Sequence, residues 1–162
     1  MSDANELISF IASMSGEGNL RVEENLGEGY VRLRVSEAER RQAKHDIQHV
    51  EDIVIEMLRN ARDAGADKVY LATTKEDGVR TLVFLDNGSG VPQDMQERIF
   101  DARVTSKLES MKMDRWGVHG RGMALFSIKQ NTDEARVVTS GVDLGSAFKA
   151  VSYTHLRAHE TK

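Results

Sequence analysis

Three short segments that combine glycine with polar side chains constrain the fold of this 162-residue chain most strongly. Residues 56–65 lie at the end of a predicted helix, residues 86–92 follow a predicted strand, and residues 117–122 precede another predicted helix. Helix ends and glycine turns leave backbone groups without partners inside their own element. We therefore expect the chain to fold so that these three segments meet around one polar site.

A long helix is predicted to carry the first segment. Apolar residues recur at helical spacing from Ile47 to Ala61, so one side of the helix is expected to pack on a core. Ser36 and Glu39 form a capping-box signature at its start, and Gly65 has the position of a C-terminal cap. The pattern predicts one continuous helix between Ser36 and Gly65.

Runs of β-forming residues predict a sheet beside this helix. The runs at residues 68–73 and 80–85 are joined by a turn at residues 76–78 and predict an antiparallel hairpin. The other strands are predicted at residues 19–24, 30–35, 136–139 and 147–151, and the other helices at residues 3–14, 93–100 and 123–130. Residues 101–116 are polar and irregular, which is typical of a lid or a binding loop.

Composition narrows the class of protein. The chain is 40% hydrophobic and 30% charged, as globular domains are, and its net charge of -4 does not indicate a nucleic-acid-binding surface. Without cysteine, it has no disulfide, thiolate nucleophile or cysteine–zinc site. No apolar run approaches a membrane span of about 18 residues, and the acidic N-terminus does not resemble a secretory signal. We expect a cytoplasmic protein.

The predicted helix places Glu56, Asn60 and Asp63 on one face, because residues three or four positions apart are neighbours on a helix. Glu56 lies close to the apolar stripe, where a carboxylate is costly unless it has a partner or a chemical role. The role we predict is that of a general base toward a water that attacks a phosphate. The amide oxygen of Asn60 is a suitable ligand for Mg²⁺. The alternative is a surface helix with a polar residue on every turn.

Asp86 directly follows an apolar strand and precedes two glycines, Gly88 and Gly90. An ionised carboxylate at a strand end can accept a hydrogen bond from the exocyclic amino group of adenine. The two glycines would then let the backbone approach the base. An ordinary Asp-Asn-Gly turn is the alternative interpretation.

The third segment places Gly117, Gly120 and Gly122 before a predicted helix, whose N-terminal N–H groups and dipole favour phosphate. Lys107 and Arg121 would add positive charge. This glycine spacing is a weak signal alone, and it lacks the lysine ending of a P-loop. Taken together, the three segments predict a site for ATP and Mg²⁺.

In spacing and order, the segments resemble the motifs of the GHKL ATPase superfamily, which contains gyrase-type topoisomerases, MutL mismatch-repair proteins, heat-shock chaperones and histidine kinases. Residues 56–65 resemble its N box, and residues 86–90 and 117–122 resemble its two glycine boxes. The resemblance covers about residues 30–151. The sequence is most similar to the mismatch-repair branch at residues 60–66, 105–107 and 117–128.

The resemblance implies an α+β fold, a two-layer α/β sandwich in which helices cover one face of a mixed, mostly antiparallel sheet (the Bergerat fold). It implies Glu56 as catalytic base, Asn60 as the Mg²⁺ ligand and Asp86 as the adenine contact. The other residues implied in nucleotide binding are Asp63, Gly88, Gly90, Val91, Lys107, Gly117, Val118, His119, Gly120, Arg121, Gly122 and Thr139. Residues 101–116 are implied to form the lid.

The implied function is that of an ATPase module in which Mg-ATP binding orders the lid. Binding would drive homodimerisation through the lid and the N-terminal segment, or docking of another domain. Hydrolysis to ADP and phosphate is expected to be slow, because relatives take a lysine that contacts the γ-phosphate from a following domain. Two alternatives stay open: a histidine-kinase-like or anti-sigma-like protein kinase domain, and an ATP-binding switch without hydrolysis.

Three parts are expected along the chain. Residues 1–29 are predicted to be an N-terminal extension of a helix and a strand, and residues 30–152 the ATP-binding domain. Residues 153–162 continue neither a helical nor a strand period and resemble translated adaptor sequence, so they are expected to be a non-native tail. The natural protein would then continue beyond residue 152 into a further domain.

Overall fold

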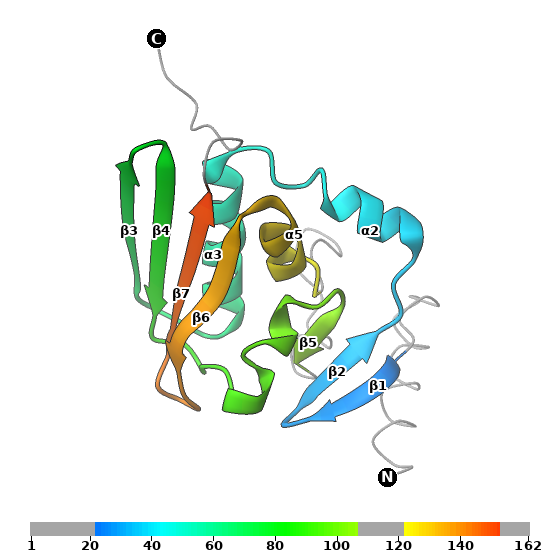
Figure 1. Ribbon diagram of the computed structural model, residues 1–162. Coiled ribbons are helices and arrows are strands. Elements are labelled where there is room, and N and C mark those ends of the chain that lie inside the picture. The colour runs from blue at the N-terminus through cyan, green and yellow to red at the C-terminus, as the bar shows by residue number, and fades with distance from the viewer. Residues whose placement is uncertain (1–21, 107–121, 153–162) are drawn as a thin grey trace.

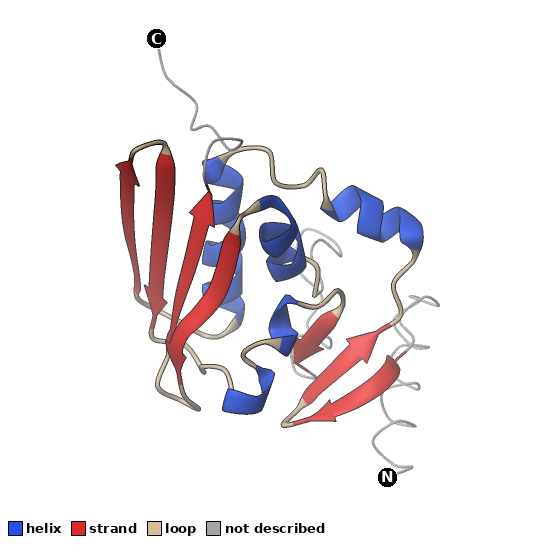
Figure 2. Ribbon diagram, viewed as in Figure 1, coloured by secondary structure: helices blue, strands red, loops and turns tan. Residues whose placement is uncertain are grey.

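The structure, a computed structural model, describes residues 22–106 and 122–152, which form two sheets together with several helices (Figure 1). The larger sheet has the strand order β3-β4-β7-β6 and the smaller has the order β1-β2-β5. Every pairing within these two sheets is antiparallel. Helices α3 and α5 lie on the same face of the larger sheet (Figure 2). The predicted α+β class, with helices on one face of a largely antiparallel sheet, is confirmed.

The larger sheet begins with the predicted hairpin, which is confirmed as β3 (Val69–Glu76) and β4 (Val79–Asp86). Its turn residues Asp77 and Gly78 have φ angles of 49° and 78°, the left-handed values that a tight hairpin turn requires. Strands β7 (Ser146–Ser152) and β6 (Glu134–Ser140) complete the sheet at the predicted places. The alternation of β4 points Leu82 and Phe84 into the core and leaves Leu85 exposed.

Helix α3 (Val50–Asp63) packs on this sheet through one apolar side. Ile53, Met57 and Ala61 are buried on that side, each four residues after the last. Helix α5 (Ala124–Asn131) adds the buried Ile128 to the same cluster as Phe84 and Phe148. Because this core fixes the rotation of α3 about its axis, it also fixes which side chains the helix presents on its other side.

The prediction of one helix from Ser36 to Gly65 is wrong, because the structure has α2 (Glu37–Ala43) and α3 with a break between them. The predicted capping box of Ser36 and Glu39 is present at the start of α2. The break is stabilised by Asp52, whose Oδ2 accepts hydrogen bonds from the backbone N–H groups of Gln48 and His49 at 2.9 and 2.8 Å. These bonds satisfy donors that open a new helix, so α3 starts at Val50.

The smaller sheet consists of β1 (Val22–Gly27), β2 (Tyr30–Leu33) and β5 (Val104–Ser106). The domain boundary predicted at residue 30 falls at the start of β2, within the β1–β2 hairpin. Strand β5 corrects the expectation that residues 101–116 are irregular throughout, because β5 pairs with β2. The single helix predicted at residues 93–100 is instead two 3-10 turns, η1 (Gln93–Met95) and η2 (Arg98–Phe100).

Several predictions fall on residues outside the described ranges. These are the helix at residues 3–14, the remainder of the lid at residues 107–116 and the tail at residues 153–162. Across residues 22–106 and 122–152, no helix combines the length and the apolar character needed to cross a membrane.

Candidate functional site

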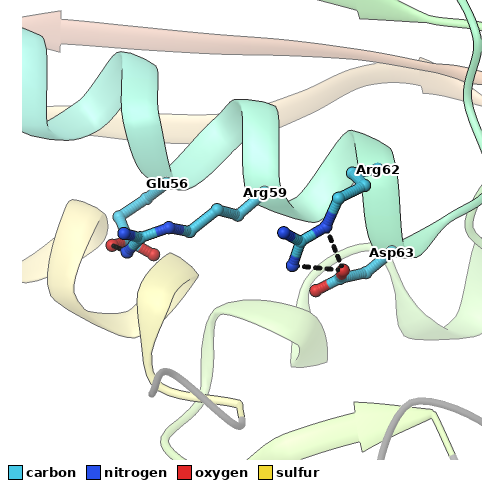
Figure 3. A network of polar contacts seen from close by, with 4 residues as sticks. All are labelled: Glu56, Arg59, Arg62 and Asp63. Carbon is cyan, nitrogen blue, oxygen red and sulfur yellow. Dashed lines mark hydrogen bonds and ion pairs between the residues drawn. The ribbon is translucent and has the colours of Figure 1, made fainter. Parts of the chain in front are cut away.

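One side of α3 carries two ion pairs (Figure 3). Glu56 Oε1 accepts a hydrogen bond from Arg59 Nη1 at 2.7 Å, and Asp63 Oδ1 accepts hydrogen bonds from Nε and Nη2 of Arg62 at 3.0 and 2.9 Å. The side chain of Glu56 is 23% exposed and that of Asp63 is 43% exposed. Glu56 therefore lies at the border between the core side of the helix and the solvent.

Asn60 follows Glu56 by one helical turn, and its side chain is incompletely satisfied. Its Nδ2 atom is buried and has no hydrogen-bond partner within the part of the chain that the structure describes. Such a buried donor costs about 1–3 kcal/mol unless it finds an acceptor, such as the oxygen of a water or of a ligand. Asn60 is therefore a position where an additional polar partner would stabilise the fold.

The Asn60 amide carries an oxygen beside the unpaired Nδ2, and Mg²⁺ prefers oxygen ligands and retains several waters. The Asn60 amide oxygen would be one ligand. The described residues contain no group of three or more histidine, cysteine, aspartate or glutamate side chains that could hold a metal ion. Phosphate oxygens and waters would thus have to supply most of the coordination, as is usual for magnesium bound together with a nucleotide.

Asp86 ends β4 and begins a turn that its own carboxylate helps to fix. Asp86 Oδ1 accepts a hydrogen bond from the backbone N–H of Gly88 at 2.9 Å, whereas Oδ2 accepts none within residues 22–106 and 122–152. The neighbouring Asn87 Oδ1 accepts from the backbone N–H groups of Asp67 and Lys68 at 3.1 and 2.9 Å. The turn therefore holds Asp86 in one orientation and leaves one half-buried carboxylate oxygen available to a donor.

The same turn contacts the C-terminal end of α3. The backbone N–H of Ser89 donates to the carbonyl of Ala64 at 2.9 Å, and Gly88 lies so close that an added Cβ would be 2.9 Å from Ala64 Cβ. Since a helix rises about 1.5 Å per residue, Asn60 lies about 6 Å and Glu56 about 12 Å from Ala64 along the axis. The Asp86 turn, Asn60 and Glu56 thus follow one another along a single helix.

The other side of the turn packs against the loop between β6 and β7. Ser89 O accepts from the backbone N–H of Asp143 at 2.8 Å, and the backbone N–H of Val91 donates to Ser140 Oγ at 2.7 Å. The side chain of Val91 is buried in the core, and Thr139, the residue before Ser140, is exposed on β6. The turn and the end of β6 are therefore joined directly.

Gly122 is the one residue of the predicted phosphate loop that the structure describes. Its carbonyl accepts a hydrogen bond from the backbone N–H of Arg103 at 2.7 Å, so it lies beside β5 shortly before α5 begins. The other residues predicted to bind phosphate lie outside the described ranges: Lys107, Gly117, Val118, His119, Gly120 and Arg121. The structure thus brings the first two predicted segments together and describes one end of the third.

Some residues that hold the site were not predicted from the sequence. Arg59 is one of them, although its spacing of three residues from Glu56 is a recognisable signal for a helical ion pair. Ser140 and Ala64 also contact the Asp86 turn, but through backbone groups or a small hydroxyl, and no local sequence pattern indicates those long-range contacts.

Comparison with known families assigns the chain to one of them. Residues 47–161 match the family described as Histidine kinase-, DNA gyrase B-, and HSP90-like ATPase. The match covers more than half of the chain, so the chain belongs to this family, which is the predicted GHKL ATPase superfamily.

Relatives of known name include DNA mismatch repair protein MutL from two bacteria. The chain is 33% identical over 93 residues to the protein of Thermodesulfovibrio yellowstonii and 34% identical over 113 residues to that of Staphylococcus aureus strain Newman. These alignments cover 56% and 64% of this chain but 17% of each relative, so the chain spans less than a fifth of their length.

Two solved structures match the chain over most of its length. The mycobacterial sensor histidine kinase MprB has a TM-score of 0.44 and 16% identity, with 92% of this chain and 93% of that chain covered. Full-length ShkA in complex with AMPPNP has a TM-score of 0.48 and 18% identity, with 96% and 31% covered.

Proposed function

We propose that this chain is a Mg-ATP-binding ATPase module whose nucleotide lies along α3. The observation that carries the proposal is the order of groups on that helix: the Asp86 turn at its C-terminal end, then Asn60, then Glu56. Adenine, the magnesium-bound phosphates and the γ-phosphate follow one another in the same order in ATP. The family membership supports ATP as the ligand.

Each end of the site has a group suited to its part of the nucleotide. Asp86 Oδ2 accepts no hydrogen bond within the described ranges and would accept one from the adenine amino group. Gly88, Gly90, Val91, Thr139 and Asp63, which precedes Ala64, are proposed to act at this end, and Lys107 and residues 117–122 are proposed to act near the phosphates. Mg²⁺ held by Asn60 and by phosphate oxygens would neutralise the negative charge that develops during hydrolysis.

Glu56 is the proposed general base. Its Oε1 is engaged by Arg59, and its Oε2 has no hydrogen-bond partner in the described part of the chain, so Oε2 can hold a water and take its proton. Binding of Mg-ATP is proposed to order the lid and to drive dimerisation or docking of a further domain, with slow hydrolysis to ADP resetting the module.

Substitution of the base separates binding from chemistry. Glu56→Ala should retain Mg-ATP affinity in calorimetry and lower the single-turnover rate of hydrolysis of labelled ATP by roughly 100-fold or more, because general-base catalysis contributes about that much. Glu51→Ala, an exposed glutamate at the start of the same helix, is the matched control and should leave both quantities unchanged.

Two results would contradict the hydrolytic assignment. One is a hydrolysis rate of Glu56→Ala equal to that of the wild type, which would remove Glu56 from the chemistry. The other is binding without any hydrolysis by the wild type, which would favour the switch. Labelled phosphate transferred to a protein side chain would favour the kinase alternative.

A further inference from the structure

The contact between Arg59 and Glu56 connects a charged side chain of α3 to the proposed base. Arg59 Nη1 donates to Glu56 Oε1 at 2.7 Å, and Figure 3 shows the Arg59 side chain extending back along the helix to the Glu56 carboxylate. The Glu56 side chain is 23% exposed, whereas the Arg59 side chain is 51% exposed. In this pair the glutamate side chain is therefore mostly buried, and the arginine side chain is half exposed to solvent.

Helix geometry explains why Arg59 reaches Glu56 and not the core. At about 100° per residue, Arg59 lies about 60° from Glu56, on the side away from the buried Ile53, Met57 and Ala61. Asn60 lies on the opposite side of Glu56, next to that buried stripe. Glu56 is thus flanked by a cation that holds it and by an amide that faces the core.

A glutamate side chain has three rotatable bonds, so a carboxylate without a partner would sample several positions. The single contact with Arg59 removes that freedom at one oxygen. It leaves the second oxygen, Oε2, without a partner in the described ranges. In general-base catalysis the base works best when a further group orients it, because misplacement of the reacting groups by about 1 Å can cost about 100-fold in rate.

We infer that Arg59 is a positioning residue, which acts through Glu56 by fixing its carboxylate so that Oε2 faces the attacking water. This inference rests on the proposed ATPase function and assigns Arg59 no contact with the nucleotide. It therefore separates two effects: loss of Arg59 lowers kcat and leaves the affinity for Mg-ATP unchanged.

The test is a double-mutant cycle on the full chain, with single-turnover hydrolysis of labelled ATP and calorimetric Mg-ATP binding as readouts. Arg59→Gln should lower the hydrolysis rate by roughly 10- to 100-fold, with an unchanged Kd. Arg59→Lys, which keeps a positively charged N–H donor group on a long stem, should restore most of the rate. In a Glu56→Gln background, Arg59→Gln should have no further effect, because the group through which it acts is gone.

Arg136→Gln is the matched control, because Arg136 is also 51% exposed and also paired with a glutamate, Glu134, at 2.6 Å on β6. It should leave the rate unchanged, and melting temperatures of all variants should match that of the wild type.

The outcomes distinguish this inference from the proposed function. A wild type that neither binds nor hydrolyses Mg-ATP overturns the function itself, and binding without hydrolysis overturns both the hydrolytic step and the role of Arg59. If the wild type hydrolyses ATP and Arg59→Gln matches its rate, the positioning role is overturned and the ATPase assignment stands. A Kd at least 10-fold weaker in Arg59→Gln would instead make Arg59 a nucleotide contact and also overturn the inference.

Discussion

Gly90 illustrates how a glycine in the site is required by the fold. Its φ angle is +74°, and a Cβ atom at this position would overlap the carbonyl oxygen of Gly141 in the loop between β6 and β7. Gly65, at the end of α3, has nearly the same φ of +75°, but nothing lies within 4 Å of the position of its Cβ. The two glycines share the backbone conformation and differ in the space around them.

This difference gives a prediction at the residue scale. Gly65→Ala should lower the free energy of unfolding by about 1 kcal/mol, because alanine is strained in the left-handed region. Gly90→Ala should lower it by about 1–3 kcal/mol more, because the added methyl also forces two backbone segments apart. Urea unfolding of both variants measures the difference, and equal losses would show that the turn does not pack against residue 141 as described.

Among the elements, α2 is joined to the rest of the fold through the buried Ala43, which packs with Ala102 and Met123, and through Glu39. One carboxylate oxygen of Glu39 accepts from the backbone N–H and the hydroxyl of Ser36 at 2.7 and 3.0 Å, and the other pairs with Arg103. Arg103 is 15% exposed, and its backbone N–H and C=O bond to Gly122 and Leu33. Glu39 therefore links the start of α2 to Arg103. Arg103 in turn contacts Leu33 of β2 and Gly122, which precedes α5.

At the element scale, Ser36→Ala should cost about 1 kcal/mol of unfolding free energy, which is typical for the loss of a helix N-cap. Glu39→Ala should cost more, because it removes the reciprocal cap and also the carboxylate partner of a mostly buried arginine. Denaturant unfolding of the two variants is the measurement. A smaller loss for Glu39→Ala than for Ser36→Ala would contradict the link to Arg103.

Local patterns predicted the elements that depend on local signals. The β3–β4 hairpin followed from two apolar runs around Asp77 and Gly78, and the start of α2 followed from Ser36 and Glu39. The break before α3 was missed because the apolar stripe continues through Ile47, while the interruption comes from the Asp52 carboxylate binding backbone N–H groups. Strand β5 was missed because its partner, β2, is far away in sequence.

The candidate site was predictable only where it depends on local sequence patterns. Glu56, Asn60 and Asp63 could be placed on one helix from their spacing, and Asp86 could be placed at a strand end. Neither periodicity nor turn chemistry shows that the Asp86 turn bonds to Ala64 and to Ser140 through Ser89 and Val91. Those contacts connect the end of α3 to the end of β6, and they bring the first two segments into one site.

For the whole molecule, we propose that this arrangement binds one molecule of Mg-ATP along α3. The chain corresponds to less than a fifth of the length of its MutL relatives. The measurement suited to this chain alone is therefore ATP binding. Asp86→Asn is the appropriate substitution, because the amide oxygen can still accept from Gly88 N–H while the second acceptor becomes a donor. The fold should be preserved, whereas the hydrogen bond from the adenine amino group should no longer form.

Calorimetric titration of Mg-ATP into the wild type, Asp86→Asn and Asp77→Asn tests this claim most directly. Asp77 lies in the turn at the opposite end of β4, where asparagine also tolerates a positive φ, so Asp77→Asn should bind as the wild type does. Asp86→Asn should bind about 10- to 100-fold more weakly, as expected for a hydrogen bond to a charged group worth about 1.5–3 kcal/mol. Equal affinity of Asp86→Asn and the wild type, or no binding by the wild type, would contradict the account.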